Sequence, residues 1–344
     1  MGTQVPETAE ALFYTAPGQA ELRQVALPPL APGMVEVRTL YTGLSRGTER
    51  LVAAGQVPPD EYATMRAPHQ EGAFPFPVKY GYAAVGQVEA GPEALIGREV
   101  FCLYPHQDRF RVAAEAVLPL PEGVPAARAV LAANAETALN AIWDAELAPG
   151  EPVLVLGAGL LGCLIAAFLS RIHGSVDVTD KLAEPAARLA DFPVNFVPPE
   201  AVGDHYHVIF HSTASAAGLQ AALQALAFEG RVVELSLFGD REVSLRLGER
   251  FHSRRLTIRA SQVGHVAPAR RPTTSRRDRL GEALALVGIG CFVLFQRPWG
   301  VTAGFALWGA RFSTPSASRS PTGATGKAGA RASSRPASSP TAPR

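Results

Sequence analysis

The chain has 344 residues, of which 47% are hydrophobic, and its formal net charge is +1 at pH 7. This length suffices for two domains, and the composition is that of a globular protein. Residues 283–344 hold seven Arg or Lys and no Asp or Glu, so residues 1–282 have a net charge of −6, which argues against a nucleic-acid-binding surface on the main body. The three cysteines, Cys102, Cys163 and Cys291, form no C-x-x-C pair. Their spacing argues against a disulfide framework or a cysteine-rich zinc lobe and indicates a reducing, cytoplasmic location.

The first part of the chain has a β-rich texture. Short runs such as "VEVRTLYTG" and "EVFCLY" alternate with Pro and Gly, which predicts a compact, mostly β domain over residues 1–125. From residue 126 the pattern changes to apolar strands that alternate with Ala/Leu-rich helices, as in "EPVLVLGAGLLGCLIAAFL". This predicts an α/β fold over residues 126–280, a doubly wound parallel sheet with helices on both faces.

Residues 281–344 break this order. The apolar run "LALVGIGCFVLF" is shorter than the roughly 20 residues of a membrane span, so we expect a buried or broken helix and no membrane contact. The tail after it is rich in Ser, Pro, Ala and Arg, and it predicts disorder. Acidic residues disappear abruptly here, and we hypothesise that a reading-frame change or a sequencing error replaced the original end beyond about residue 285.

The segment "VLVLGAGLLGC" has G-x-G-x-x-G spacing directly after an apolar strand and at the start of an apolar helix. Gly157 permits a tight turn, Gly159 lets the backbone approach a diphosphate, and Gly162 lets the helix pack close to the strand. The helix start at Leu160 and Leu161 offers free N–H groups to the anion. A glycine turn that binds no nucleotide is the alternative.

The next strand, "SVDV", leads to Asp180, whose carboxylate would accept hydrogen bonds from ribose hydroxyls and repel a 2′-phosphate. This favours NAD over NADP as the cofactor. The neighbouring Lys181 weakens that preference, so NADP stays open.

This order of parts resembles the medium-chain dehydrogenase/reductase superfamily of alcohol dehydrogenase type, in which a GroES-like catalytic domain precedes a Rossmann domain. The resemblance covers about residues 10–265 and rests on "YTGLSRGTE", "KYGYAAVGQVEAG", "AANAETALNAIWDA" and "VLVLGAGLLG". The S-x-G-T-E element with G-Y is also similar to the bacteriochlorophyllide dehydrogenase group, which indicates relatives and not a substrate.

In zinc-dependent members of this superfamily the metal ligands are the Cys of T-G-I-C, the His of G-H-E and a Cys or Glu four residues before a Thr that contacts the nicotinamide. Here these positions hold Ser45, Tyr82 and Ala133, and the Thr is Thr137. A hydroxyl, a phenol and a methyl do not make a zinc site. The resemblance therefore implies a zinc-independent branch with no bound metal.

Hydride transfer without zinc needs side chains that stabilise charge on the substrate oxygen and exchange its proton. The resemblance places Ser45, Arg46, Thr48 and Tyr82 in the cleft between the domains. Tyr82 would bind a substrate carbonyl, and Arg46 would stabilise a phenolate or alkoxide. The alternatives are a packing role for Tyr82 and a phosphate or surface contact for Arg46, while Glu49 is interpreted as a structural carboxylate that holds its loop.

Three further acid–base candidates stand apart from this group. His106 follows an apolar strand and would titrate near neutrality, or it is a structural histidine. His69, in a second Pro-His-Gln triplet, is a weaker candidate. Glu136, beside Thr137, is either a buried acid with a raised pKa or a charge at the start of a helix.

Two clusters have mainly structural interpretations. His205, His207 and His211 fall on one strand face if the strand is continuous, and a metal site there is poorly supported. The basic residues near the end of the main body indicate a solvated face, with a polyanion or 2′-phosphate contact as the alternative; they are Arg254, Arg255, Arg270, Arg271, Arg276, Arg277 and Arg279.

We therefore expect a cytoplasmic, zinc-independent, NAD(P)-dependent oxidoreductase that interconverts an alcohol and a carbonyl of a small molecule by hydride transfer. A quinone-reductase-like enzyme that reduces an activated double bond, a catalytically inactive nucleotide-binding relative and a polyanion-binding protein are the alternatives. No nucleic-acid partner is expected, and a homodimer is left open.

Overall fold

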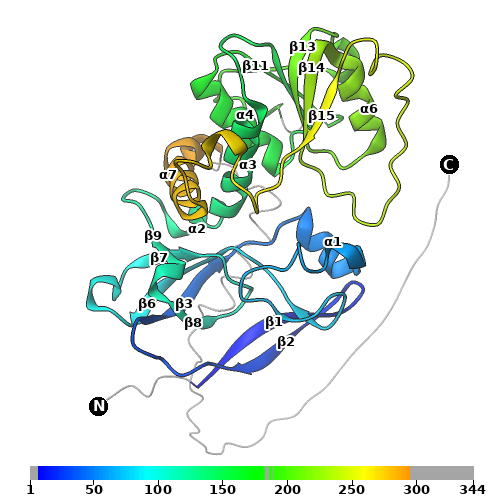
Figure 1. Ribbon diagram of the computed structural model, residues 1–344. Coiled ribbons are helices and arrows are strands. Elements are labelled where there is room, and N and C mark those ends of the chain that lie inside the picture. Colours follow the sequence, from blue (N-terminus) through cyan, green and yellow to red (C-terminus); the bar gives the residue numbers. More distant parts are fainter. Residues whose placement is uncertain (1–6, 183–185, 188, 295–344) are drawn as a thin grey trace, which may run out of the picture. The chain divides into compact units, whose positions relative to one another are not determined.

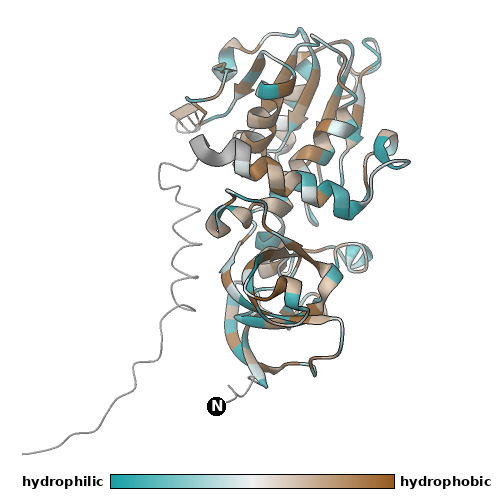
Figure 2. Ribbon diagram, turned by 90° about the vertical axis from the view of Figure 1, so that its left-hand side faces the viewer, coloured by the Kyte–Doolittle hydropathy of each residue, from teal (hydrophilic) through white to brown (hydrophobic). Residues whose placement is uncertain are grey.

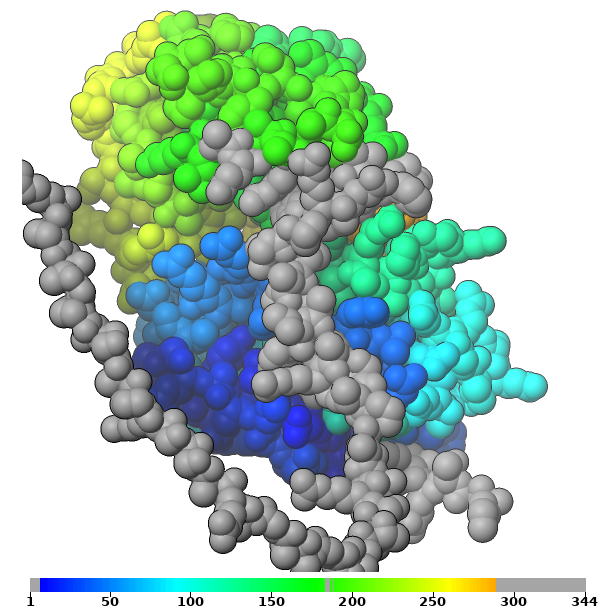
Figure 3. Space-filling view, turned by 180° about the vertical axis from the view of Figure 1, so that it is seen from behind, coloured from blue at the N-terminus to red at the C-terminus, as the bar shows by residue number. Residues whose placement is uncertain are grey.

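The computed structural model describes residues 7–182, 186–187 and 189–294 (Figure 1). The described residues belong to one compact unit. In the space-filling view the residues of the parallel-sheet part (green to yellow) form a continuous surface (Figure 3). The tail predicted to be disordered, and most of the segment assigned to a reading-frame change, lie outside the described residues.

The N-terminal part is built from antiparallel strands in two sheets, with the orders β2-β1-β5-β4 and β8-β3-β6-β7-β9. Side chains alternate between the core and the surface along these strands; in β8, Phe110 and Val112 are buried. This confirms the predicted β-rich, GroES-like domain. The strands are β1 (Thr8–Ala16), β2 (Gln19–Ala26), β3 (Met34–Thr42), β4 (Glu71–Gly72), β5 (Val78–Lys79), β6 (Ala84–Ala90), β7 (Glu99–Cys102), β8 (Arg109–Ala113) and β9 (Val117–Pro119).

The C-terminal part contains a six-stranded, all-parallel sheet in the order β12-β11-β10-β13-β14-β15. This is the 3-2-1-4-5-6 order of a doubly wound dinucleotide fold, whose switch point lies between β10 and β13. The α/β fold class and the Rossmann topology are therefore confirmed. The strands are β10 (Val153–Leu156), β11 (Val176–Thr179), β12 (Val194–Phe196), β13 (Tyr206–His211), β14 (Leu226–Glu234) and β15 (Thr257–Ala260).

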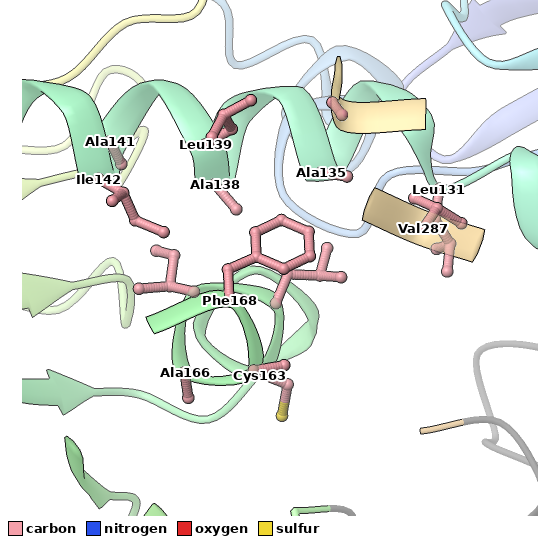
Figure 4. Close-up of a cluster of buried hydrophobic side chains, with 14 of the residues drawn as sticks. Leu131, Ala135, Ala138, Leu139, Ala141, Ile142, Cys163, Ala166, Phe168 and Val287 are labelled. Carbon is pink, nitrogen blue, oxygen red and sulfur yellow. The ribbon is translucent and has the colours of Figure 1, made fainter. Parts of the chain in front are cut away.

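Helices cover both faces of this sheet, whose strands are mainly hydrophobic (Figure 2). Three helices, α3, α4 and α7, share one apolar cluster, in which Phe168 of α4 lies below Ala138 of α3 and Val287 of α7 lies against Leu131 (Figure 4). Helix α6 packs in a separate cluster on β13 and β14. The helices are α1 (Thr48–Ala54), α2 (Ala126–Ala129), α3 (Ala132–Ala145), α4 (Leu160–Ile172), α6 (Ala216–Ala225) and α7 (Arg276–Leu294), with short 3-10 turns η1 (Pro59–Glu61), η2 (Glu93–Leu95), η3 (Ala114–Ala116), η4 (Pro199–Ala201) and η5 (Pro268–Arg270).

Helix α7 is the last described element, and it runs through the position 280 at which the sequence predicts a domain end. Ala283, Leu284 and Val287 are buried, so its apolar side packs on the helical layer. This agrees with the expectation of a buried helix in this segment. No helix in the described part of the chain is long and apolar enough to cross a membrane.

Candidate functional site

The glycine turn lies between β10 and α4, at the carboxyl edge of the parallel sheet. Gly157 has φ of 103°, a conformation that other residues rarely adopt, and its N–H donates to the Thr179 carbonyl at 2.9 Å. A Cβ atom on Gly162 would lie 1.9 Å from the Gly157 carbonyl oxygen. Packing therefore requires glycine at Gly157 and Gly162, as the sequence motif predicts.

Gly159 differs from Gly157 and Gly162, because a Cβ atom on Gly159 would meet no atom within 4 Å. It is the N-cap residue of α4, and no side chain among the described residues caps this helix start. The first N–H groups of α4, at Leu160 and Leu161, are thus available for an anion. The open space in front of Gly159 and these donors fit the diphosphate of a dinucleotide.

Asp180 directly follows β11 and faces the glycine turn. Its Oδ2 accepts a hydrogen bond from the Ala158 N–H at 2.7 Å, and its Oδ1 accepts one from the Leu182 N–H at 2.9 Å. An ionised carboxylate has about four acceptor positions, so two stay available for ribose hydroxyls. The partly exposed Asp180 therefore fits the adenosine ribose, with Lys181 exposed beside it.

The β-rich domain brings three of the predicted catalytic residues together. The side chains of Ser45 and Thr48 lie near the Tyr82 phenol and act to lower its pKa. Burial, followed by the negative charge of Glu49, raises the pKa of Tyr82 to about 12 against this effect. Tyr82 is therefore a neutral phenol at pH 7, suited to donate a hydrogen bond. Arg46 is exposed on the same loop.

Glu49 and His106 form a buried pair behind this loop. The Oε1 of Glu49 accepts from the Ser45 N–H at 2.7 Å, and its Oε2 lies 2.6 Å from His106 Nε2 and accepts from the Tyr14 hydroxyl at 3.2 Å. On the far side, His106 Nδ1 lies 2.6 Å from the Thr42 hydroxyl. Glu49 thus holds the Ser45 loop, in agreement with its structural interpretation. His106 is fully buried and reaches that loop through Glu49.

Gly81 explains why a glycine precedes Tyr82. Its φ is 129°, and a Cβ atom there would lie 2.8 Å from His106 Nε2. Any other residue at this position would push into the imidazole. The sequence motif around Tyr82 gives no sign of this contact, because Gly81 and His106 belong to different segments.

Glu136 forms a buried ion pair with Arg279. Its Oε1 accepts from the Nε and Nη2 of Arg279 at 3.0 and 2.9 Å, and Arg279 also donates to the Asn140 side chain and to the His265 carbonyl. Burial raises the pKa of Glu136, and the Arg279 guanidinium opposes that shift. The predicted solvated face is therefore wrong for Arg279, which is fully buried and joins α7 to α3.

Thr137 is partly exposed on α3, and its hydroxyl donates to the Ala133 carbonyl at 3.0 Å. The buried methyl of Ala133 occupies the third zinc-ligand position of the resemblance, whose other two positions hold the hydroxyl of Ser45 and the phenol of Tyr82. This donor set does not fit zinc. Among the described residues there is also no group of three His, Cys, Asp or Glu side chains that could hold a metal ion.

The remaining histidines take different environments. His69 stacks on Tyr104 at a ring distance of 5.0 Å, and burial, followed by the charge of Lys79, lowers its pKa. His205 and His207 are exposed, whereas His211 is fully buried.

No family model matches the chain, and no curated protein matches its sequence. Its structure is similar to L-idonate 5-dehydrogenase from Escherichia coli K-12, with 12% identity and a TM-score of 0.66 over 83% of this chain and 89% of that one. An alcohol dehydrogenase from E. coli CFT073 in complex with NADH has 15% identity and a TM-score of 0.62, over 83% and 89% of the two chains. A zinc-binding dehydrogenase from Sinorhizobium meliloti 1021 bound to NADP has 16% identity and a TM-score of 0.64, over 83% and 90%.

At this level of identity the likeness shows a shared fold. The described residues have the arrangement that the sequence resemblance implies, an antiparallel β-rich part followed by a parallel six-stranded sheet, and they share this fold with the three solved dehydrogenases. The solved structures that share this fold include proteins complexed with NADH and with NADP.

Proposed function

We propose that this chain is an NAD(P)-dependent oxidoreductase that interconverts an alcohol and a carbonyl without zinc. The observation that carries the proposal is the turn from Gly157 to Gly162, which combines an open approach at Gly159 with an uncapped helix start. That combination suits a diphosphate, and Asp180 stands where an adenosine ribose would follow.

The cofactor preference follows from Asp180. Its two backbone hydrogen bonds hold the carboxylate beside the glycine turn, where a 2′-phosphate would meet a negative charge at short range. We therefore favour NAD over NADP. When bound, the nicotinamide would supply or accept the hydride, and the protein's own side chains would position the substrate oxygen.

Tyr82 is the proposed donor to that oxygen. Because burial and Glu49 keep its phenol protonated, Tyr82 can donate a hydrogen bond and then a proton as a carbonyl is reduced. The side chains of Ser45 and Thr48 lie near this phenol and would be its polar neighbours during the reaction. With a pKa of about 12 the phenol is protonated at neutral pH, which is the form that can give a proton to a carbonyl as it is reduced.

Turnover assays with chelator-treated protein test the proposed zinc-independent activity. NADH oxidation should be followed with a panel of aldehydes and ketones and with a panel of enones and quinones, alongside elemental analysis for zinc. The proposal expects carbonyl-dependent oxidation of NADH by metal-free protein. Stoichiometric zinc would contradict the proposed mechanism, turnover of enones alone would indicate a double-bond reductase, and NADH binding with no turnover would indicate an inactive nucleotide-binding relative.

A further inference from the structure

A surface pocket of about 660 Å³ lies among three helices, away from the glycine turn. Its walls come from the C-terminal halves of α3 and α4, from the loop that follows α3, from η5 and from α7. It borders Arg171, Ile172 and His173 at the end of α4, whereas the glycine turn precedes the start of that helix. At 1.5 Å per residue the two ends of α4 are about 18 Å apart, so the pocket is separate from the proposed cofactor site.

The wall of this pocket is mainly apolar. Leu139 and Ile142 of α3, Phe168 of α4 and Leu286 of α7 line it, and the Phe168 ring lies in the space between α3 and α4 (Figure 4). Ile172 adds an apolar side chain that is 70% exposed, a surface that a bound ligand would cover. Small-molecule sites usually measure about 300–1,000 Å³, so the pocket has room for an apolar body of that class.

Arg270 brings a positive charge to this apolar pocket. Its guanidinium lies over the Trp143 ring, 5.1 Å from the ring centroid, and both side chains line the pocket. Among the described residues, no oxygen accepts a hydrogen bond from this exposed guanidinium. Contact with an aromatic face leaves the N–H groups of a guanidinium available, and these are the donors that bind a carboxylate.

The acidic residues of the pocket limit the charge of a ligand. Glu146 and Glu282 line the pocket together with the cationic Arg171 and Arg270. Glu146 is neutralised from outside the pocket, because its Oε1 accepts from Arg259 at 2.7 Å. Glu282 is exposed and would repel a dianion more strongly than a monoanion. The charges of the pocket therefore suit a single carboxylate better than a phosphate.

We propose that this pocket binds an amphipathic monocarboxylate. The apolar body of the ligand lies against the wall formed by α3, α4 and α7, and its carboxylate accepts hydrogen bonds from Arg270. The inference does not depend on the proposed function, because no residue of the glycine turn lines the pocket. A monocarboxylate and a dinucleotide would therefore bind to the same chain at the same time.

Calorimetric titration of the full-length chain tests the proposal, with octanoate as the probe and 1-octanol as its uncharged counterpart. The wild type should bind one octanoate per chain, more tightly than 1-octanol and with the same affinity in saturating NADH. Arg270→Gln should bind octanoate about tenfold more weakly, the effect of one charge-assisted hydrogen bond, and 1-octanol equally well. Arg271→Gln is the matched control, because Arg271 donates to the Val266 carbonyl at 2.8 Å and does not line the pocket.

Ile172→Asn tests the apolar wall separately. Because the Ile172 side chain is 70% exposed, this substitution should leave the thermal midpoint unchanged. It removes an apolar contact that both ligands would make, so octanoate and 1-octanol should both bind more weakly. Leu22→Asn is the control, since Leu22 is an exposed apolar residue of β2 outside the pocket, and it should bind both ligands like the wild type.

A wild-type chain that shows no saturable binding of octanoate would overturn the inference. Wild-type affinity of Arg270→Gln for octanoate would also overturn it, and competition between octanoate and NADH would do so by placing octanoate at the cofactor site. Sedimentation velocity addresses a second copy of the chain as the occupant. If Ile172→Asn converts a dimer into a monomer, another copy covers the pocket and the proposal is wrong.

Discussion

Tyr82 is the residue on which proton transfer depends in the proposed reaction. It stands where zinc-dependent relatives of this architecture are expected to have histidine, and its phenol lies near the side chains of Ser45 and Thr48. The charge of Glu49 behind it disfavours a phenolate. In the proposed reaction, this one neutral donor would take the polarising role that a metal ion has in zinc-dependent enzymes.

Tyr82→Phe should keep the ring and remove the donor. We expect carbonyl reduction to fall by about 10²- to 10⁴-fold, the usual contribution of a general acid, with NADH affinity unchanged. Steady-state kinetics and an NADH titration measure both quantities. Tyr80→Phe is the matched control, because the Tyr80 hydroxyl donates to the Met65 carbonyl at 3.1 Å and should not affect turnover. Equal losses in the two variants would contradict the role of Tyr82.

Asp180 carries the cofactor preference through its charge. Asp180→Asn keeps the shape and an acceptor for the Ala158 N–H but removes the repulsion of a 2′-phosphate. We expect the ratio of the NADPH and NADH dissociation constants to fall several-fold, measured by nicotinamide fluorescence. An unchanged or larger ratio would show that Asp180 does not select the cofactor.

At the scale of elements, the start of α4 is the feature that would hold the diphosphate. Gly159→Val places a branched side chain in space that contacts nothing within 4 Å, so the fold should tolerate it while the ligand does not. We expect NADH affinity to fall by more than about tenfold with little change in the thermal midpoint. Gly248→Val, at another glycine with open space around its Cβ position, is the control and should bind NADH normally.

An ion pair between Arg279 of α7 and Glu136 of α3 joins the two helices. Arg279→Met removes one partner of this buried pair, and leaving Glu136 alone should cost about 3–5 kcal/mol in the free energy of unfolding at pH 7, measured in urea. Burial raises the pKa of Glu136, so the folded state favours its protonated form. The penalty should therefore shrink as the pH is lowered through the range in which Glu136 takes up its proton.

Glu136→Gln provides the complementary measurement. This substitution removes the titrating carboxyl but keeps a side-chain oxygen for Arg279. The free energies of unfolding of Glu136→Gln and Arg279→Met should therefore differ most at neutral pH. A penalty for Arg279→Met that is constant from pH 4 to pH 8 would contradict the ion-pair account of α7.

For the whole molecule, the elements that carry a local sequence signal could be predicted. The alternation of apolar strands and helices predicts the parallel sheet, and the spacing of Gly157, Gly159 and Gly162 predicts the turn, because both depend on neighbouring residues. The pairing of Ser45 with Tyr82 came from the family resemblance, since they lie on separate segments.

The buried polar pairs could not be predicted from the sequence, because their members also lie on separate segments. Arg279 has the local appearance of one charge in a basic run, and only the fold shows its partner Glu136 on α3. His211 and Glu234 meet because β13 and β14 are adjacent, which the strand order decides and the spacing along the chain does not. Charges that meet across elements leave no periodic pattern in the sequence.

The central claim is that the turn between β10 and α4 binds a nicotinamide dinucleotide. Isothermal titration of the wild-type protein with NADH tests it most directly, without any assumption about the substrate. The account predicts saturable binding of one NADH per chain, tighter than the binding of NADPH. Heats no larger than those of dilution for both dinucleotides would contradict it.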